Sequence, residues 1–204
     1  MKIDIEDVLF WMDAIRNSDN RYRTLESFWK GQVKSKIWLI EALEKHNRSI
    51  MNADVVIHGG WNGVLSSLLF NSNLGIRHIT SIDIDRTCEN TANTINKRYE
   101  IQGKFNSITQ DMVTYKYDKP PYLIINTSCE HINQEQYLEW LSNVPKSSTV
   151  VLQSNNYFEL DEHINCSKNL EEFVKKSNLK VDVAETLSFE KYDRYMIIGK
   201  KQNV

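Results

Sequence analysis

The stretch DVVIHGGWNGVLSSLLFNSNLGIRHITSIDID, residues Asp54–Asp85, decides the fold of this chain. It opens with the β-branched run 55–57, which is typical of a strand buried on both faces of a parallel sheet. A glycine-rich turn over 58–63 follows, and the apolar residues of 64–69 then fall on one helical face. A second apolar run ends at Asp83. The order strand, glycine turn, helix, strand and acid predicts a βαβ unit that binds a nucleotide-like cofactor.

This order resembles the first half of a class I S-adenosylmethionine (SAM) dependent methyltransferase. In that family the loop after the first strand usually reads E/D-x-G-x-G-x-G, and the acid that closes the second strand binds the ribose. Gly59 and Gly63 match the outer glycines, whereas Trp61 stands at the middle glycine and Ile57 at the leading acid. The stretch 81–96, SIDIDRTCENTANTIN, matches the family better, because an acid after an apolar strand and small residues in the next helix are common there.

Two other interpretations of the glycine turn remain. A dinucleotide-binding Rossmann domain requires G-x-G-x-x-G, and Trp61 and Ser66 stand where two of those glycines belong, so NAD fits less well. An ordinary glycine turn in another α/β fold is the second alternative.

The composition limits the class of protein. A chain of 204 residues suits one domain with a well-buried core, and its formal net charge of -2 demands neither nucleic acid nor an anionic membrane. Three cysteines without a CxxC pair argue against a disulfide framework and for a reducing cytoplasm. No apolar run approaches the roughly 20 residues that span a bilayer. We therefore expect a cytoplasmic protein without a membrane partner.

Two apolar patterns of helical period precede the first strand. The first covers 5–15, the turn-forming stretch RNSDNRYR interrupts it, and the second covers 24–45. Trp29 and Trp38 of the second pattern are expected in the core. The sequence thus predicts N-terminal helices that pack on the sheet.

A third strand is expected over 104–108, and Asp111 follows it after a short polar step. In the family that the chain resembles, an acid at this place and the backbone of the next residue hold the adenine. The resemblance therefore implies that Asp111 and Met112 bind the adenine ring.

Polar and ionisable residues follow the fourth predicted strand, YLIIN. Ligands of open α/β sheets lie at the carboxyl ends of the strands, so a polar cluster at this position is hard to explain by packing. Glu130 and His131 are predicted as general base and acid, because histidine titrates near neutral pH. Cys129 is predicted to contact the substrate, and Asn126 to contact the cofactor.

Structural roles for the same residues stay open. Asn126 or Ser128 is a candidate cap for the following helix, Cys129 a candidate core residue, and Glu130 a candidate complement to the positive end of that helix. A metal site is not predicted, because no second histidine or cysteine stands three or four residues after His131.

The fifth predicted strand, STVVLQSNN, ends in polar and aromatic residues. Asn155 and Tyr157 are predicted to line the substrate pocket, and His163 is kept as a residue of the same rim. The tail 181–201 reads as two strands joined by a tight turn around 191–194, and members of the family end in such a hairpin.

These elements predict a three-layer α/β/α sandwich with a seven-stranded, mostly parallel sheet, an antiparallel last strand and N-terminal helices. A helical segment, 1–50, is expected to pack on a SAM-binding domain, 51–204, within one compact domain overall.

The resemblance implies S-adenosyl-L-methionine as the cofactor and methyl transfer to a small-molecule acceptor as the reaction. The residues expected to bind the cofactor are His58, Gly59, Gly60, Trp61, Gly63, Asp83, Ile84, Asp111, Met112 and Asn126.

Two alternatives to that assignment remain. A nucleic-acid or protein methyltransferase needs a basic groove, for which Lys34, Lys36 and Arg77 are the candidates. A SAM-binding protein that transfers no methyl group is suggested by Trp61 in the glycine loop. The apolar N-terminal helices also offer a surface through which two chains can pair, so a homodimer stays open.

Overall fold

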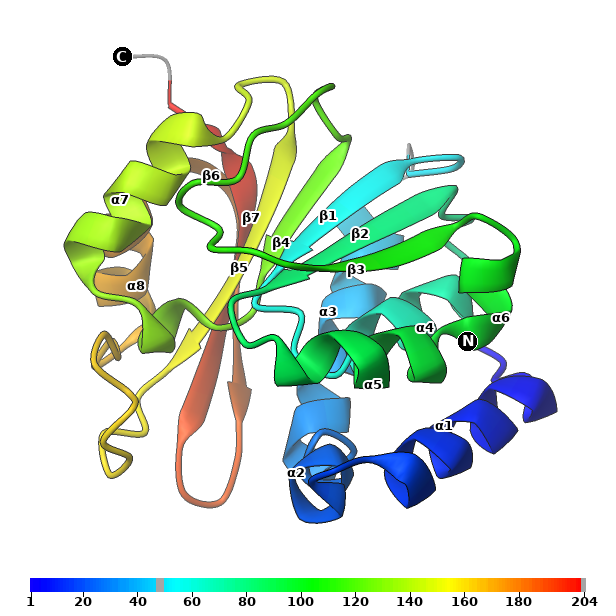
Figure 1. Cartoon of the computed structure of the whole chain (residues 1–204). Helices are drawn as coiled ribbons and strands as arrows, with labels where there is room; N and C mark the ends of the chain where they lie inside the picture. The colour runs from blue at the N-terminus through cyan, green and yellow to red at the C-terminus, as the bar shows by residue number, and fades with distance from the viewer. Residues whose placement is uncertain (47–49, 203–204) are drawn as a thin grey trace. The chain divides into compact units, whose positions relative to one another are not determined.

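The structure is a computed structural model that describes residues 1–46 and 50–202. It confirms the predicted sandwich, because helices flank a seven-stranded sheet in which β7 runs antiparallel to its neighbours (Figure 1). The strand order is β3-β2-β1-β4-β5-β7-β6. The strands are β1 (Asp54–His58), β2 (His78–Asp83), β3 (Phe105–Thr109), β4 (Leu123–Asn126), β5 (Thr149–Asn155), β6 (Leu179–Ser188) and β7 (Asp193–Lys201). The helices are α1 (Ile5–Asn17), α2 (Arg21–Glu26), α3 (Lys30–His46), α4 (Val64–Phe70), α5 (Thr87–Ile95), α6 (Lys97–Ile101), the 3-10 helix η1 (Cys129–His131), α7 (Gln134–Asn143) and α8 (Leu170–Ser177).

The chain divides into two compact units, residues 1–111 and the residues from 112 onward, and each is described by itself. The helices α1 to α3 belong to the first unit together with β1 to β3. The predicted segments 1–50 and 51–204 include residues 47–49 and 203–204, which lie outside the described residues.

In the first unit β1, β2 and β3 are parallel neighbours. His58 at the end of β1 pairs with Ile82, and Asp83 at the end of β2 pairs with Thr109. The three strands therefore end at the same edge, as the βαβ pattern predicts. β-branched side chains fill the interior of β1, where Val55 and Ile57 are almost fully buried.

The N-terminal helices differ from the prediction in one break. The expected helix over 24–45 is two helices, α2 and α3, because Ser27 Oγ donates to the Thr24 carbonyl at 2.6 Å and satisfies the end of α2. Trp29 follows this break and is 71% exposed, so the prediction that it lies in the core is wrong. Trp38 lies in α3 and is half-buried.

Helix α1 is held by a buried polar network of the first unit. The Asp7 carboxylate is fully buried and accepts from Asn71 Nδ2 at 2.6 Å and from the Tyr99 hydroxyl at 2.8 Å. Trp11 Nε1 also donates to Ser67 Oγ at 3.0 Å. The contacts of α1 are thus specific, since a buried carboxylate is tolerated only where donors meet it.

The second unit contains β4 to β7 with α7 and α8. Every residue of β5 is buried, and β7 pairs with β5 and with β6 in antiparallel register (Figure 1). The terminal hairpin is therefore confirmed, but Arg194, placed in the turn by the sequence pattern, is a buried residue of β7. No helix of residues 1–46 and 50–202 is long and apolar enough to cross a membrane.

Candidate functional site

The glycine loop between β1 and α4 has left-handed backbone at three positions. Gly59 and Gly63 have φ of 64° and 75°, and Trp61 has φ of 47°. Glycine adopts this region without penalty, whereas a side chain such as that of Trp61 disfavours it. Trp61 therefore occupies a backbone conformation that suits the middle glycine of the resembled motif.

Two loop glycines lie where a larger residue does not fit. A Cβ atom at Gly60 would lie 2.0 Å from Ser81 Oγ of β2, and one at Gly63 would lie 2.6 Å from Asn96 Nδ2. Asn96 is fully buried and donates to the Gly63 carbonyl at 3.0 Å. It also lies between α5 and α6, as the C-cap of the first and the N-cap of the second.

The Asp83 carboxylate lies beside this loop. Its Oδ2 accepts from the backbone N–H of Trp61 at 2.8 Å, and its Oδ1 accepts from the backbone N–H of Asp85 at 3.0 Å. An ionised carboxylate has about four acceptor positions, so acceptor capacity remains on both oxygens. Asp83 therefore orders the loop and is still able to receive hydroxyl groups of a ligand.

Other predicted cofactor residues of the first unit lie at the same edge of the sheet. Ile84 follows Asp83 and is 72% exposed, which is unusual for an apolar side chain at a strand end. Asp111 comes two residues after β3 and is half-buried. His58 ends β1, and because burial is nearly complete the pKa of its imidazole falls to about 3. The His58 side chain is therefore a neutral part of the core.

The buried polar groups around the loop fit a polar ligand. Asn62 Nδ2, Ser66 Oγ and Ser81 Oγ are buried and have no hydrogen-bond partner among the described residues. Buried donors without partners are uncommon in folded proteins, and unmet groups at one loop are expected where a ligand or water completes them. The loop, Asp83 and Ile84 together thus suit an adenosyl cofactor.

The predicted residues of the second unit start at the end of β4. Asn126 is fully buried, donates through Nδ2 to Met112 Sδ at 3.6 Å and accepts from the Ser128 N–H at 2.9 Å. The structure thus brings together two predicted cofactor residues, Asn126 and Met112. Neither Asn126 nor Ser128 caps the following helix, because Asn133 forms a capping box with Gln136 at the start of α7.

Glu130 is the centre of a buried polar network at the end of β4. It is 3% exposed, and its Oε1 accepts from Asn155 Nδ2 at 2.8 Å and from Arg194 Nη1 at 3.2 Å. Arg194 also donates to the Thr127 carbonyl at 2.5 Å and to Gln153 Oε1 at 3.3 Å. The two hydrogen bonds to Oε1, from Asn155 and Arg194, hold the carboxylate in one orientation.

Cys129 lies under this network. It is buried, and burial together with the charge of Glu130 raises the pKa of its thiol well above the usual range. A thiol that stays protonated is a poor nucleophile, so its environment is that of a core residue. Cys166 contacts the predicted substrate residue Asn155, with Sγ at 3.2 Å from Asn155 Oδ1.

The loop after β5 returns to His131. His131 Nδ1 lies 3.2 Å from the Glu162 carbonyl, and the rings of His131 and His163 meet edge to face at 4.9 Å. His163 Nδ1 lies 2.7 Å from the carbonyl of Tyr157. His131, Tyr157 and His163 are therefore neighbours in the structure.

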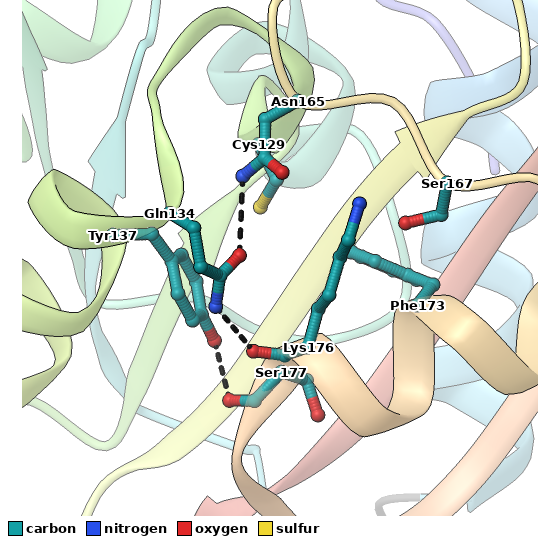
Figure 2. A pocket seen from close by; sticks show the side chains of 8 residues that line it. All are labelled: Cys129, Gln134, Tyr137, Asn165, Ser167, Phe173, Lys176 and Ser177. Carbon is teal, nitrogen blue, oxygen red and sulfur yellow. Dashed lines mark hydrogen bonds between the residues drawn. The ribbon is translucent and has the colours of Figure 1, made fainter.

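A further pocket lies between η1, α7 and α8 (Figure 2). Its polar groups mostly satisfy one another, since Gln134 bonds to Asn165 and to the Lys176 carbonyl, and the Tyr137 hydroxyl donates to the Ser177 carbonyl at 2.7 Å. We interpret this pocket as a gap between packed helices and not as a ligand-binding site.

Sequence reasoning missed Arg194 and Asn96. Both are buried polar residues, with exposed fractions of 6% and 0%, and each bonds to a residue far away in the sequence, Glu130 and Gly63 respectively. No sequence pattern predicts that such a residue is buried, because a lone arginine or asparagine is usually exposed.

Comparison with known proteins gives structural matches only. No protein-family model matches the chain, and no curated protein matches it by sequence. Among solved structures, N-methyltransferase NodS from Bradyrhizobium japonicum WM9 with S-adenosyl-l-homocysteine matches 95% of this chain and 99% of its own, at 10% identity and a TM-score of 0.66.

Magnesium protoporphyrin IX methyltransferase (ChlM) from Synechocystis PCC 6803 with bound SAM matches 96% of this chain and 91% of its own, at 14% identity and a TM-score of 0.64. A variant of MtNAS in complex with S-adenosylmethionine matches 96% of this chain and 72% of its own, at 14% identity and a TM-score of 0.62. At these identities the likeness concerns the fold, and the chain therefore has the Rossmann-like fold that these SAM- and SAH-bound proteins share.

Proposed function

We propose that the chain binds S-adenosyl-L-methionine and transfers its methyl group to a small-molecule acceptor. The observation that carries this proposal is the edge formed by β1 and β2, where Asp83 holds a left-handed glycine loop and keeps acceptor capacity. Three solved structures with this fold carry SAM or SAH, which supports the same ligand class.

The residues divide into three proposed roles. Gly59, Gly60 and Gly63 shape the loop around the cofactor, Asp83 receives the ribose hydroxyls, and Ile84 covers the adenine. In the first unit Asp111 is also proposed to contact the adenine, and the backbone of His58 and Trp61 belongs to the proposed loop. Met112 and Asn126 of the second unit are proposed as further contacts of the cofactor. Bound SAM supplies an activated methyl group, so the protein contributes mainly position and orientation.

The proposed acceptor side consists of Glu130 and His131, with Cys129, Asn155 and Tyr157 as its walls. His131 is exposed and is the group of this set that can take a proton from an acceptor hydroxyl or amine. Glu130 is fixed by Arg194 and Asn155, so its proposed contribution is to position and to supply negative charge.

A nucleic-acid acceptor is the less favoured proposal. Of its three candidate cations, Lys36 is buried and bonds to Gln32 Oε1 at 2.9 Å, and Arg77 is paired with Asp54. We also propose a cytoplasmic location, supported by the absence of a disulfide among Cys88, Cys129 and Cys166.

A homodimer through α1 is a further proposal about partners. Ile5, Leu9 and Met12 lie on one side of this helix and are exposed in the chain. Sedimentation velocity of the chain and of Leu9→Glu checks it: a dimer that dissociates in the variant supports the proposal, and a monomer at all concentrations contradicts it.

The test of cofactor binding is calorimetric titration of the full chain with SAM, SAH and NAD. Ile84→Ser is the informative variant, because an exposed side chain is replaced without disturbing the core. Ile101→Ser is the matched control, since both isoleucines are 72% exposed. Binding of SAM and SAH that weakens in Ile84→Ser alone is expected, and no binding of either ligand by the natural chain contradicts the proposal.

Methyl transfer is tested separately from SAM binding. The SAM-bound MtNAS variant has a similar fold but is not described as a methyltransferase, so the fold with bound SAM does not by itself establish transfer. The chain is incubated with SAM labelled in its methyl group and with the small-molecule, nucleic-acid and protein fractions of a cell extract. Label in the small-molecule fraction is expected. Retained SAM binding with no label in any fraction would favour a SAM-binding protein without methyl transfer.

A further inference from the structure

Three potential metal ligands lie close together in the second unit. Glu130, His131 and His163 each offer one ligand atom, and these atoms all lie within 4.8 Å of one another. The sequence pattern predicted no metal, because a second histidine had to come from a distant part of the chain. The loop after β5 supplies it, and the Asn165 N–H donates to the Glu130 carbonyl at 3.0 Å to fix that loop against η1.

Both histidines are oriented as metal-bound histidines are. His131 Nδ1 faces the Glu162 carbonyl at 3.2 Å, and His163 Nδ1 faces the Tyr157 carbonyl at 2.7 Å. A carbonyl only accepts, so in each neutral ring Nδ1 carries the proton and Nε2 keeps the lone pair. A metal-bound histidine typically donates its other N–H to such a carbonyl, which fixes the ring.

Glu130 provides an independent sign of a missing ligand. Its Oε1 has two donors, but its Oε2 is buried and has no hydrogen-bond partner among the described residues. The residue is 3% exposed, so water does not freely solvate this oxygen. A buried acceptor without a donor is unfavourable, and a bound cation removes that cost.

Arg194 is the charge that opposes a cation here. Its guanidinium donates to Glu130 Oε1, to Gln153 Oε1 and to the Thr127 carbonyl, and it forms no hydrogen bond with Glu130 Oε2. Hydrogen bonds to a ligating carboxylate from outside the metal shell are common, and they orient it. Arg194 is therefore compatible with a site that binds through Oε2, with an affinity below that of an unpaired carboxylate.

We propose that Glu130, His131 and His163 bind one divalent transition-metal ion through Oε2 and the two Nε2 atoms. Two imidazoles and one carboxylate suit zinc or iron(II), whereas magnesium and calcium prefer oxygen ligands. Ligands about 2.1 Å from a tetrahedral ion stand about 3.4 Å apart, and one ligand atom from each of the three side chains already lies within 4.8 Å of the others. His131 is exposed, which leaves an open coordination position.

The open position gives the ion a task in the proposed reaction. Water bound to such an ion loses its proton near neutral pH, so an acceptor hydroxyl bound there would release its proton to solvent. Its oxygen would then bond to the methyl carbon of SAM as the bond from that carbon to sulfur breaks and S-adenosylhomocysteine leaves. This task rests on the proposed methyl transfer. When the ion is bound, His131 is a metal ligand and does not act as the base. The binding of the ion itself rests on the three side chains alone.

The test is titration of the metal-free full chain with Co²⁺, followed by visible absorption, and with Zn²⁺, followed by calorimetry. His163→Asn and His131→Asn remove one ligand each, and His46→Asn removes an exposed histidine at the end of α3 as the control. Circular dichroism verifies that each variant is folded. No SAM is present, so failure here leaves the cofactor proposal untouched.

We expect one ion per chain and at least about 100-fold weaker binding in each ligand variant, because outer partners alone contribute 10- to 100-fold. His46→Asn should bind as the natural chain does. Absence of binding by the natural chain overturns the proposal. So does equal binding by His163→Asn and His46→Asn, or a near-ultraviolet thiolate-to-cobalt band that assigns the ion to cysteine.

Discussion

The Asp83 carboxylate accepts a hydrogen bond from the backbone N–H of Trp61 at 2.8 Å, across 22 positions of sequence. Asp83, at the end of β2, therefore holds the backbone of Trp61, the loop residue that stands in place of the middle glycine. Trp61 keeps a left-handed backbone, with φ of 47°, that glycine adopts at no cost. The bond to Asp83 is one interaction that offsets this cost.

Replacing Asp83 by asparagine should destabilise the first unit by about 1–3 kcal/mol. The amide has one acceptor oxygen, so one of the N–H groups of Trp61 and Asp85 must then face an NH₂ donor. Urea unfolding followed by circular dichroism measures the change in free energy. Asp54→Asn at the start of β1 is the control, because its exposed pair with Arg77 should contribute less than about 1 kcal/mol. Equal effects of the two variants would show that the Trp61 bond is unimportant.

Gly60→Ala should destabilise the chain by about 1–3 kcal/mol, because its Cβ would lie 2.0 Å from Ser81 Oγ. In a Ser81→Ala background the nearest atom becomes the Cβ of residue 81, at 3.3 Å. The cost of Gly60→Ala should therefore fall in that background, and a double-mutant cycle of unfolding free energies measures the difference. An unchanged cost would place the strain elsewhere in the loop.

Stability should fall as the pH drops from 7 toward 5.5, and His58 should account for part of that loss. Burial lowers the pKa of its imidazole from 6.5 to about 3. Between these values the unfolded chain binds a proton that the folded chain does not, so stability is present above pH 6.5 and is lost below it, by at most about 1.4 kcal/mol per pH unit.

His58→Asn removes this titration and should give a shallower dependence of the unfolding free energy on pH. The slope is the measured quantity, because the substitution also changes stability at every pH. His78 contributes a smaller loss of the same sign, since burial lowers its pKa as well, and it stays present in the variant. An identical slope in the variant would show that His58 is not the group responsible.

The three thiols should be unreactive in the folded chain. Burial and the nearby charge of Asp83 raise the pKa of Cys88 to about 12, and burial with the charge of Glu130 raises the pKa of Cys166 to about 11 and that of Cys129 further. The thiolate is the reactive form, so modification by a chromogenic disulfide at pH 8 should be slow and should accelerate on unfolding. A rapid reaction of one thiol per native chain would contradict the burial of that cysteine.

Much of the fold was predictable because it depends on patterns that adjacent residues carry. The β-branched runs of β1 and β5 and the tail hairpin read directly as strands, and Asp83 lies at the strand end where it was expected. The breaks in the helices were not predictable to the same degree. The break after α2 depends on Ser27 bonding to a carbonyl, which competes with the helix only in a particular geometry.

The polar sites were predictable in part. Glu130 and His131 stand at a strand end and were found there, but their partners Arg194 and His163 come from a strand and a loop far along the chain. Such partners depend on register and loop path, which a single sequence does not specify. Trp29 shows the opposite error, because its apolar character suggested the core although the break between α2 and α3 turns it outward.

The Glu130–Arg194 pair should show strong coupling in stability. Both residues are buried, and Arg194 donates to the carboxylate at 3.2 Å. Glu130→Gln leaves the guanidinium buried opposite a neutral amide, and Arg194→Met leaves the carboxylate with Asn155 as its remaining donor. Each single variant should lose about 3–5 kcal/mol of unfolding free energy, because an uncompensated buried charge is costly.

The double variant Glu130→Gln with Arg194→Met removes both charges and should be more stable than the sum of the two losses predicts, by about 1–3 kcal/mol. Urea unfolding in the presence of a chelator measures the cycle without a contribution from a bound metal ion. The exposed pair Lys97–Glu100, with nitrogen and oxygen 2.6 Å apart, is the control and should couple by less than about 1 kcal/mol. Additive losses at Glu130 and Arg194 would mean that each side chain is stabilised mainly by its neutral neighbours, and that the ion pair does not hold the end of β4 to β7.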